Sequence, residues 1–457
     1  MKKMASFSLT TLLKNLGKHH KFLVAFSGGL DSTVLLHGLL SLRDQNHLKL
    51  NIRAIHTHEK LIHRPENWSK DADQRLTHCQ SQCEQWKVPL EVVKMEVEPR
   101  GKGIEAAART VRYQIFSNAL KKDEVLLTGH HQNDQCETVL LALKRGSGPA
   151  GLSGMPLAMP LGQSQLLRPQ LSFSRHSLQL YALEKGILWM EDEDNQNDRF
   201  DRNFLRRHIL PLLTGRWPHF LESTSRSAAL CAEQETLLDE LLSEQLCQLQ
   251  SQEGTLSIKG LAGCSEVKRN ALLRRWLDGK KVPMPSRDQL ARLWKEVALA
   301  KSDAQPYLQC GEYQIRRFRE HLYLLKSSKK SQPCPAIFSI KWPFTPESEN
   351  KLVLPDHLGE LKCTPYRSEG QVIRAPQKNE VISIRFGLTG NIKILGRDRS
   401  RHSKKLWQEL GIPPWERKRI PLLYFNETLI AAAEVFVTQK GEAKQGEPHC
   451  YLEWVKS

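Results

Sequence analysis

The amino-acid sequence predicts an α/β protein with three parts: a parallel sheet flanked by helices, a mostly helical middle domain and a small α+β domain at the C-terminus. Three observations predict this layout. Strand-like apolar runs alternate with helix-like runs along the N-terminal part, which is typical of a parallel sheet with helices on both faces. One long helical pattern then replaces the alternation. Strand-like runs return from Tyr307 onward.

The alternation in the N-terminal part consists of short apolar or β-branched runs and longer runs with helical spacing of apolar residues. Because ligands of such sheets bind beyond the carboxyl ends of the strands, the loops that follow the strands are the first places to search for a site. The predicted strands are 21–26, 50–56, 90–97 and 124–128, and the predicted helices are 33–42, 71–86, 104–120 and 134–144.

The loop with the sequence SGGLDS, residues 27–32, joins the first predicted strand to the first predicted helix. Its glycines Gly28 and Gly29 let the backbone approach a ligand, Ser32 can cap the helix, and the N–H groups at the helix start favour an anion. No lysine follows the glycines and Asp31 lies inside the loop, so this is not a Walker A loop. We predict a nucleotide site that does not perform conventional γ-phosphate hydrolysis; the alternative is a glycine-rich turn without a ligand.

A second candidate site follows the predicted strand 124–128. Gly129 and His130 lie at the end of this strand, and Asp134 and Glu137 are three residues apart on the next helix. This spacing places both carboxylates on one helix face. They predict an anionic pocket for a cation, either an ammonium group or magnesium. The alternative is that they only complement the helix dipole.

Basic residues outnumber acidic ones by 67 to 50, giving a net charge of +17 and a pI near 9.4. This excess favours nucleic acid as a partner, although an ordinary basic protein is the alternative. The segment 391–420, called the basic segment below, carries nine basic and three acidic residues. Trp407 and Trp415 lie within it and are predicted either to stack on bases or to belong to the core.

Ten cysteines are scattered without any Cys-x-x-Cys pair. Cys79 and Cys83 share a helix face but lack further zinc ligands, so we expect them to be buried thiols. Reduced cysteines, no signal peptide and no apolar run long enough for a membrane span predict a cytoplasmic protein.

Changes in composition divide the chain into four segments. Its character changes near Trp217, and the polar stretch 327–335 reads as a linker. Within these segments the sequence predicts helices 223–250, 266–277, 287–299 and 403–410, and a hairpin at 424–430. The segments are 1–215 with the nucleotide site, 216–330 as the helical middle domain, 331–380 as a linker and strand region, and 381–457 as the basic α+β domain.

Taken together, the motifs resemble those of the tRNA(Ile)-lysidine synthase family, part of the PP-loop ATP pyrophosphatase superfamily. The loop 27–32 is shared with other adenylating enzymes, whereas the combination is far more specific and covers essentially the whole chain. The motifs are AFSGGLDS at 25–32, GIEAAAR at 103–109, DQCET at 134–138, KRGSG at 144–148, DRNFLR at 201–206, WQELGIPPW at 407–415 and ETLIAAA at 427–433.

The resemblance implies a Rossmann-like PP-loop domain and a ligase that joins free L-lysine to C2 of the wobble cytidine of tRNA(Ile) with a CAU anticodon. The cytidine is adenylated first, so that ATP and Mg²⁺ give AMP and diphosphate. Codon reading then changes from AUG to AUA, and amino-acid identity from methionine to isoleucine.

The resemblance also implies roles for individual residues, which stand beside simpler readings. Arg109 is otherwise a solvated helix residue, and Arg202 and Arg206 otherwise belong to a helix-capping cluster. The implied roles are ATP binding by Ser27, Gly28, Gly29, Leu30, Asp31, Ser32, Gly129 and His130; catalysis by Asp31 and Arg109; lysine binding by Asp134 and Glu137; magnesium binding by Asp31 or Asp134; and tRNA binding by Arg145, Arg202, Arg206, Arg397, Arg401, Lys404 and Lys405.

The sequence departs from the family pattern at Glu59 and Lys60, where His-Gly is frequent, at Asn133, where aspartate is common, and at Asp194, where serine is usual. A tRNA thiolase resembling cytidine thiolases is disfavoured because such enzymes need Cys-x-x-Cys pairs. A small-molecule ligase does not explain the basic segment, and a non-catalytic RNA-binding protein does not explain the intact acidic and basic site residues. The sequence is compatible with a monomer or a homodimer.

Overall fold

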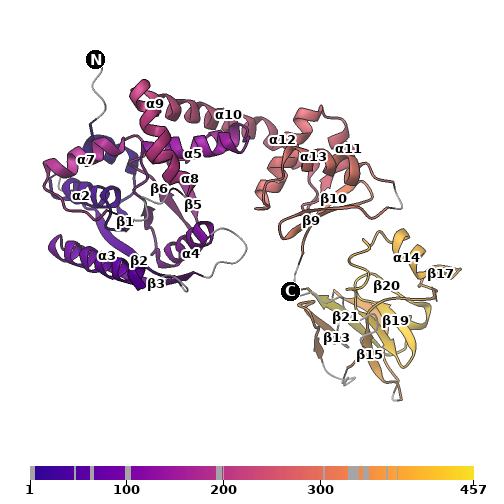
Figure 1. The fold of residues 1–457 in the computed structure, drawn as a ribbon. Coiled ribbons are helices and arrows are strands. Elements are labelled where there is room, and N and C mark those ends of the chain that lie inside the picture. Colours follow the sequence, from indigo (N-terminus) through magenta and orange to yellow (C-terminus); the bar gives the residue numbers. More distant parts are fainter. Residues whose placement is uncertain are drawn as a thin grey trace. The chain divides into compact units, whose positions relative to one another are not determined.

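The structure is a computed structural model that describes residues 6–45, 48–61, 66–97, 104–191, 198, 200–301, 304–327, 339–342, 349–366, 369–377 and 379–456. The chain forms two compact units, Met1–Leu241 and Leu242–Ser457, shown in Figure 1. The division falls inside the long helix α10 (Phe220–Leu249). No helix in the described ranges is both long and apolar enough to cross a membrane.

The first unit is built on a six-stranded sheet with the order β3-β2-β1-β4-β6-β5. Its strands run parallel except that β5 and β6 form an antiparallel hairpin. The four predicted strands are confirmed, whereas the hairpin of two four-residue strands was not predicted. The strands are β1 (Lys21–Ala25), β2 (Asn51–Leu61), β3 (Leu90–Val97), β4 (Val125–Leu127), β5 (Ala158–Leu161) and β6 (Ser164–Leu167).

The helices of the first unit include the four predicted ones, and they lie on both faces of the sheet (Figure 1). The short helices α1, α6, α7, α8 and α9 were not predicted. The helices are α1 (Leu9–Leu16), α2 (Leu30–Gln45), α3 (Glu66–Gln85), α4 (Ile104–Ala119), α5 (Gln132–Lys144), α6 (Pro149–Leu152), α7 (Arg175–Glu184), α8 (Asp201–Phe204), the π-helical segment η2 (Leu205–Ile209) and α9 (Leu210–Arg216).

Alternate side chains of β1 supply both cores of this sheet. Phe22 and Val24 pack with residues of α1, α2 and α3 on one face, while Leu23 packs against Phe116 of α4 on the other. Since successive strand residues point to opposite faces, an uninterrupted apolar run is what a central strand covered on both sides requires.

The sheet order places the predicted loops at its topological switch point. β1 pairs with β2 on one side and with β4 on the other. The chain continues from β1 to β2 toward one edge of the sheet, and from β4 to the hairpin of β5 and β6 toward the other edge. The loop 27–32 follows β1, and residues 128–131 follow β4. In an open parallel sheet this is the crevice where ligands bind.

The part of the second unit before residue 327 is helical with a small antiparallel sheet of order β7-β10-β9-β8. Helices and sheet share one core that includes the fully buried Trp276 and Leu322. This agrees with the predicted helical middle domain and the return of strands at Tyr307. The elements are β7 (Leu256–Ser257), α11 (Ile258–Ala262), α12 (Glu266–Gly279), α13 (Arg287–Arg292), the π-helical η3 (Leu293–Ala298), β8 (Tyr307–Cys310), β9 (Tyr313–Phe318) and β10 (His321–Lys326).

The C-terminal part contains a five-stranded and a four-stranded sheet, with orders β11-β15-β18-β19-β20 and β12-β13-β21-β14, which contribute to one hydrophobic core. A two-stranded pair and one helix complete it. The elements are β11 (Ser339–Lys341), β12 (Asn350–Val353), β13 (Glu360–Thr364), β14 (Gln371–Arg374), β15 (Ile382–Arg385), β16 (Asn391–Ile392), β17 (Arg401–His402), α14 (Ser403–Glu409), β18 (Leu422–Phe425), β19 (Thr428–Ala432), β20 (Phe436–Val437), the short 3₁₀ helix η4 (Gln439–Gly441) and β21 (His449–Val455).

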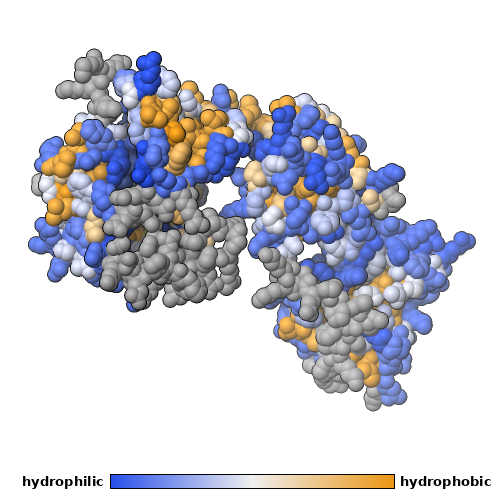
Figure 2. All heavy atoms as spheres, in the orientation of Figure 1, coloured by the Kyte–Doolittle hydropathy of each residue, from blue (hydrophilic) through white to orange (hydrophobic). Residues whose placement is uncertain are grey.

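Two predicted elements of the C-terminal part are confirmed, the helix over 403–410 and the hairpin of β18 and β19. Strands from the segment 331–380 pair with β15 and β21, so the described parts of that segment share sheets with the residues that follow it. Figure 2 shows a mainly hydrophilic surface over α14 and β17, where the basic segment lies.

Candidate active site

The loop after β1 is shaped by a glycine that no other residue can replace without strain. Gly28 has φ of +78°, and a Cβ on it would lie 2.8 Å from the Sγ of Cys79. The carbonyl of Gly28 also accepts a hydrogen bond from the backbone N–H of Met190 at 2.9 Å. The turn is therefore held between α3 and the segment after α7, and its backbone conformation is tightly specified.

Two serines close the loop through hydrogen bonds at its base. The backbone N–H of Ser27 donates to Ser32 Oγ at 3.2 Å, and Ser32 Oγ donates to the carbonyl of Gly29 at 3.1 Å. Ser32 was expected to cap the helix, but α2 begins at Leu30, so Ser32 lies inside its first turn. The N–H groups of Ser27 and Gly29 thus donate to serine oxygens, whereas the N–H groups in the first turn of a helix are the ones that an anion can contact.

Gly129 brings the end of β4 against the start of α2. A Cβ at this position would lie 2.9 Å from the backbone carbon of Asp31 and 3.0 Å from the backbone nitrogen of Ser32. Both are backbone atoms, which cannot move away by a change of side-chain rotamer. A glycine is therefore required for the two loops of the switch point to meet.

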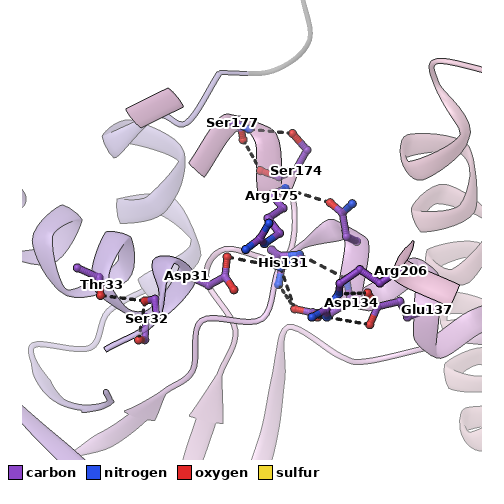
Figure 3. Close-up of polar contacts among 12 residues, drawn as sticks. Asp31, Ser32, Thr33, His131, Asp134, Glu137, Ser174, Arg175, Ser177 and Arg206 are labelled. Atoms are coloured by element: carbon purple, nitrogen blue, oxygen red, sulfur yellow. Dashed lines mark hydrogen bonds and ion pairs between the residues drawn. The ribbon is translucent and has the colours of Figure 1, made fainter. Parts of the chain in front are cut away.

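The acidic face of α5 forms as predicted, and an arginine lies across it (Figure 3). Glu137 is fully buried and Asp134 is 9% exposed. Arg206 Nε donates to Glu137 Oε1 at 2.9 Å, and its Nη2 donates to Glu137 Oε2 and to Asp134 Oδ1, both at 3.1 Å. The term "acidic face" below means Asp134 and Glu137 together.

Burial and neighbouring charges move the pKa values of the acidic face in opposite directions. Burial and the charge of Asp134 raise the pKa of Glu137, although Arg206 acts against this. Burial raises the pKa of Asp134, but His131, His130 and Arg206 lower it, and the net shift is downward. Asp134 is thus the more firmly ionised member, and Glu137 depends on Arg206 to stay charged.

His131 connects the acidic face with the loop 27–32, called the phosphate loop below. Its Nε2 lies 3.5 Å from Asp31 Oδ1 and 3.5 Å from Asp134 Oδ2. Burial lowers the pKa of His131, but the nearby Asp134 and Asp31 raise it, and the net shift is upward. The predicted nucleotide site and the predicted cation site are therefore neighbours joined by one side chain.

His130 lies among basic residues on the other side of the same loop. Its Nδ1 is 2.9 Å from Thr128 Oγ1. Burial, together with the charges of Arg168, Arg109 and Arg202, lowers its pKa to about 4 in spite of Asp134. The imidazole is therefore neutral at physiological pH, and three guanidinium groups lie close enough to shape its surroundings.

Arg109 lies on α4 with its guanidinium 5.1 Å from the ring centre of Tyr113. Its Nη2 donates to Tyr113 Oη at 3.2 Å. Arg168 is buried, and donates through Nη1 to the carbonyl of Pro156 at 2.7 Å. Tyr113 also interacts with Arg168, so Arg109, which is itself exposed on α4, is linked through Tyr113 to a buried arginine.

The remaining predicted RNA-contacting residues lie at the surface. Arg145 is exposed at the end of α5. In the basic segment, Arg397 forms an ion pair with Glu409, and Arg401 Nε lies 3.6 Å from the same carboxylate, whereas Lys404 and Lys405 are exposed on α14. Two exposed lysines beside two partly neutralised arginines make this surface basic.

The tryptophans and cysteines that the sequence singled out have structural positions. Trp407 is 3% exposed and belongs to the C-terminal core. Trp415 is half-buried, with its ring centre 5.3 Å from that of Tyr323. Cys79 and Cys83 are buried thiols, as expected, and burial raises their pKa values to about 12 and about 11.

The departures from the family pattern have different outcomes. Asn133 Oδ1 accepts a hydrogen bond from the backbone N–H of Arg175 at 3.0 Å, so it fixes the start of α7 to α5. Glu59 and Lys60 lie in β2, but their side chains are outside the described residues, as is all of Asp194.

Sequence reasoning missed the partners that complete the site. His131 and Arg168 were not proposed for it, nor was Gln170, whose amide donates to the carbonyl of Asp31 at 3.1 Å. Arg206 was assigned to tRNA or to closing the site, and no local pattern links it to Glu137. A signal for His131 did exist, since a polar residue three positions before an acid indicates a reciprocal helix cap.

These features define a class of protein. An anion-binding helix start meets an acidic face at the switch point of a parallel sheet, and residues 1–213 match the family model of the PP-loop domain. Residues 256–323 match the TilS substrate binding domain and residues 382–454 the TilS substrate C-terminal domain. The chain is an ATP-binding enzyme of the PP-loop type.

More particularly, the chain belongs to the tRNA(Ile)-lysidine synthase family, and as a member it is a tRNA-modifying ligase. It is 99% identical to the tRNA(Ile)-lysidine synthase of Hamiltonella defensa over 100% of both chains. It is 55% identical to that of Yersinia pestis over 98% of this chain and 96% of the relative, and 49% identical to that of Proteus mirabilis over 98% of each. A solved U34-tRNA thiolase from Methanococcus maripaludis gives a TM-score of 0.40 at 15% identity, over 49% of this chain and 78% of that chain.

Proposed function

We propose that this protein ligates free L-lysine to C2 of the wobble cytidine of the AUA-reading tRNA(Ile), which carries a CAU anticodon. ATP is converted to AMP and diphosphate through an adenylated cytidine, and the product reads AUA instead of AUG as an isoleucine codon. The observation that carries this proposal is that a single side chain, the imidazole of His131, lies between the acidic face and the phosphate loop. One crevice can thus hold both an activated nucleotide and an amine.

In the first step, cytidine O2 attacks the α-phosphate of ATP and diphosphate leaves. The first turn of α2 places backbone N–H groups where negative charge grows on the leaving group. The carboxylate of Asp31 projects from the same turn, with its side chain 33% exposed. Ser27, Gly28, Gly29, Leu30 and Ser32 shape the loop, while Gly129 and His130 border it from β4.

A Mg²⁺ ion bound with ATP would supply charge neutralisation at the phosphates. No group of three or more metal-ligating side chains is found among the described residues, which suits a magnesium ion held by one or two carboxylates and the substrate phosphates. Of the two predicted ligands, Asp31 fits better. Both oxygens of Asp134 already accept hydrogen bonds from protein groups, one from the backbone N–H of His131 and one from Arg206.

In the second step, the ε-amine of lysine attacks C2 and AMP leaves. Asp134 and Glu137 bind the ammonium group by sharing or exchanging the contacts that Arg206 makes with them, and the charges support this. Asp31 and the acidic face carry three negative charges when ionised, and the acidic face itself is paired with a single guanidinium, that of Arg206. A cation is therefore still attracted into the crevice, whereas a neutral homologue lacks that attraction.

The basic cluster around His130 is suited to the RNA substrate. Arg109 would stabilise charge at the adenylated cytidine, and both Arg109 and Arg202 approach the imidazole of His130. Arg145 and the exposed Lys404 and Lys405, with Arg397 and Arg401 beside them, supply phosphate contacts outside the active site. Such phosphate contacts strengthen tRNA binding but do not recognise the wobble base.

We place the reaction in the cytoplasm, and we expect either a monomer or a homodimer. All nine cysteines of the described residues are free thiols, as a reducing compartment favours.

The test is incubation of the purified protein with tRNA(Ile) transcript, ATP, Mg²⁺ and labelled lysine, followed by nuclease digestion. We expect label in the wobble nucleoside only, and none with a methionine tRNA that carries the same anticodon. Absence of label from the wobble nucleoside would refute the proposal.

A further inference from the structure

His131 is buried where the two halves of the site meet. It is 1% exposed, it precedes the first residue of α5, and its Nε2 faces Asp31 Oδ1 and Asp134 Oδ2 at 3.5 Å each. Figure 3 shows the ring between these two carboxylates. The phosphate loop and the acidic face come from chain segments about 100 residues apart, so a side chain contacting both fixes their relation.

The hydrogen bonds of His131 assign its proton. It caps α5, since its Nδ1 accepts from the backbone N–H of Asp134 at 3.4 Å and its own backbone N–H donates to Asp134 Oδ2 at 3.0 Å. A ring nitrogen that accepts carries no hydrogen, so in this tautomer the ring proton is on Nε2. The nitrogen that carries this proton, Nε2, therefore lies 3.5 Å from a carboxylate oxygen on either side.

The geometry of Asp31 depends on this contact. Its Oδ1 is buried and has no hydrogen-bond partner among the described residues, so its contact with His131 Nε2 at 3.5 Å is electrostatic, while the side chain as a whole is 33% exposed. The exposed part of the Asp31 side chain therefore does not include Oδ1. With His131 on the inner oxygen, the outer oxygen is turned toward the crevice where the phosphates of ATP bind.

We propose that His131 is a positioning residue for both steps of the reaction: through Nε2–H it orients Asp31 of the phosphate loop and Asp134 of the acidic face. It touches neither ATP nor lysine and acts through the two carboxylates. This inference rests on the proposed function, because the roles of Asp31 and Asp134 are taken from it. The competing account is that His131 is only a helix cap.

Two substitutions separate these accounts because they preserve different ends of the ring. In His131→Asn, the amide oxygen lies near the former Nδ1, so the cap is kept and asparagine is among the best N-caps, but the reach to Asp31 is lost. In His131→Gln, the longer side chain carries an amide N–H to about the position of Nε2, while the cap is weakened. Ser286→Ala removes the equivalent cap from α13 in the other unit and is the control for cap loss alone.

The experiment measures tRNA-dependent pyrophosphate release at saturating ATP, the KM for lysine in the complete reaction and the melting temperature of each full-length variant. We expect His131→Asn to melt like the native protein but to release pyrophosphate about tenfold or more slowly, because the buried polar contact with Asp31 is lost, and to show a raised lysine KM. His131→Gln should melt at a lower temperature yet remain faster than His131→Asn. Ser286→Ala should lose stability without losing activity.

If His131→Asn releases pyrophosphate at the native rate and His131→Gln is the more impaired of the two, the proposal is overturned, and the role of His131 is that of a helix cap only. An unchanged lysine KM in His131→Asn would overturn the part that concerns Asp134. If the native protein itself releases no pyrophosphate with tRNA(Ile), the proposed function has failed, which is a different result from either of these.

Discussion

The acidic face and the basic segment both carry clustered charge, but they hold it differently. Asp134 and Glu137 are buried and share one arginine over distances of 2.9 to 3.1 Å. Lys404 and Lys405 project from α14 into solvent, beside arginines that share Glu409. Buried charges act through fixed geometry and desolvation, whereas exposed charges act collectively and are screened by salt. The first region suits chemistry, and the second suits affinity for a polyanion.

The largest expected effect comes from neutralising the buried member of the acidic face. Glu137→Gln leaves Arg206 without its main counter-ion and removes one of two charges that hold the lysine ammonium. We expect the kcat/KM for lysine to fall about a hundredfold and the free energy of unfolding to fall by about 2–3 kcal/mol, less than for a fully buried pair because Arg206 is partly exposed.

The double variant Glu137→Gln with Arg206→Met separates these two effects. Removing both charges should restore much of the stability measured by chemical denaturation, because no unpaired buried charge remains. Lysine use should stay impaired. If the double variant recovers lysine use along with stability, Glu137 has only a structural role.

Gly129→Ala tests whether the two loops must meet at the switch point. The added methyl would lie 2.9 Å from the backbone of Asp31, so the start of α2 has to shift. We expect the ATP dissociation constant, measured by calorimetry, to rise about tenfold, equivalent to about 1.4 kcal/mol. Gly148→Ala is the matched control, because no atom lies within 4 Å of its added Cβ; equal effects of the two variants would contradict the close approach.

Reversing the exposed charges, Lys404→Glu with Lys405→Glu, should weaken tRNA binding about tenfold near 0.1 M salt and flatten the dependence of affinity on salt concentration. ATP affinity should not change. Arg397→Gln should weaken tRNA binding less, since Arg397 is already paired with Glu409. Filter binding across a salt series measures the tRNA affinity of each variant and its dependence on salt concentration. Unchanged tRNA affinity of the double variant at low salt would refute the assignment of this surface.

The smallest effect concerns the pH dependence of stability at His130. Its pKa is about 4 in the folded protein and 6.5 ordinarily, so its contribution to stability is complete above pH 6.5 and is lost as the pH falls toward 4. We expect His130→Asn to reduce the loss of unfolding free energy over this window by about 1–2 kcal/mol. Urea titrations at several pH values measure this. An identical pH dependence in the variant would show that His130 is not held neutral by its surroundings.

The sequence was most informative where structure depends on neighbours along the chain. The loop 27–32 and the helix that follows it form a local strand–turn–helix unit, and Asp134 and Glu137 share a face because of helical spacing alone. The predicted hairpin at 424–430 is equally local. In each case the determining contacts span only a few residues.

The sequence was least informative where a contact joins distant segments. Arg206 meets Glu137 across 69 residues of chain, and His131 meets Asp31 across about 100. Which arginine of the DRNFLR motif turns inward depends on the packing of η2 and α5, which no spacing rule specifies. The strands of 331–380 are likewise recognised as partners of β15 and β21 only through their pairing.

The most direct test of the whole account is the stoichiometry and order of products in one reaction with labelled ATP, labelled lysine and tRNA(Ile). The account predicts one AMP, one pyrophosphate and one lysidine per tRNA, with pyrophosphate release that requires tRNA but not lysine, because the phosphate loop acts before the acidic face delivers the amine. Formation of ADP and inorganic phosphate, or pyrophosphate release that requires lysine but not tRNA, would contradict it.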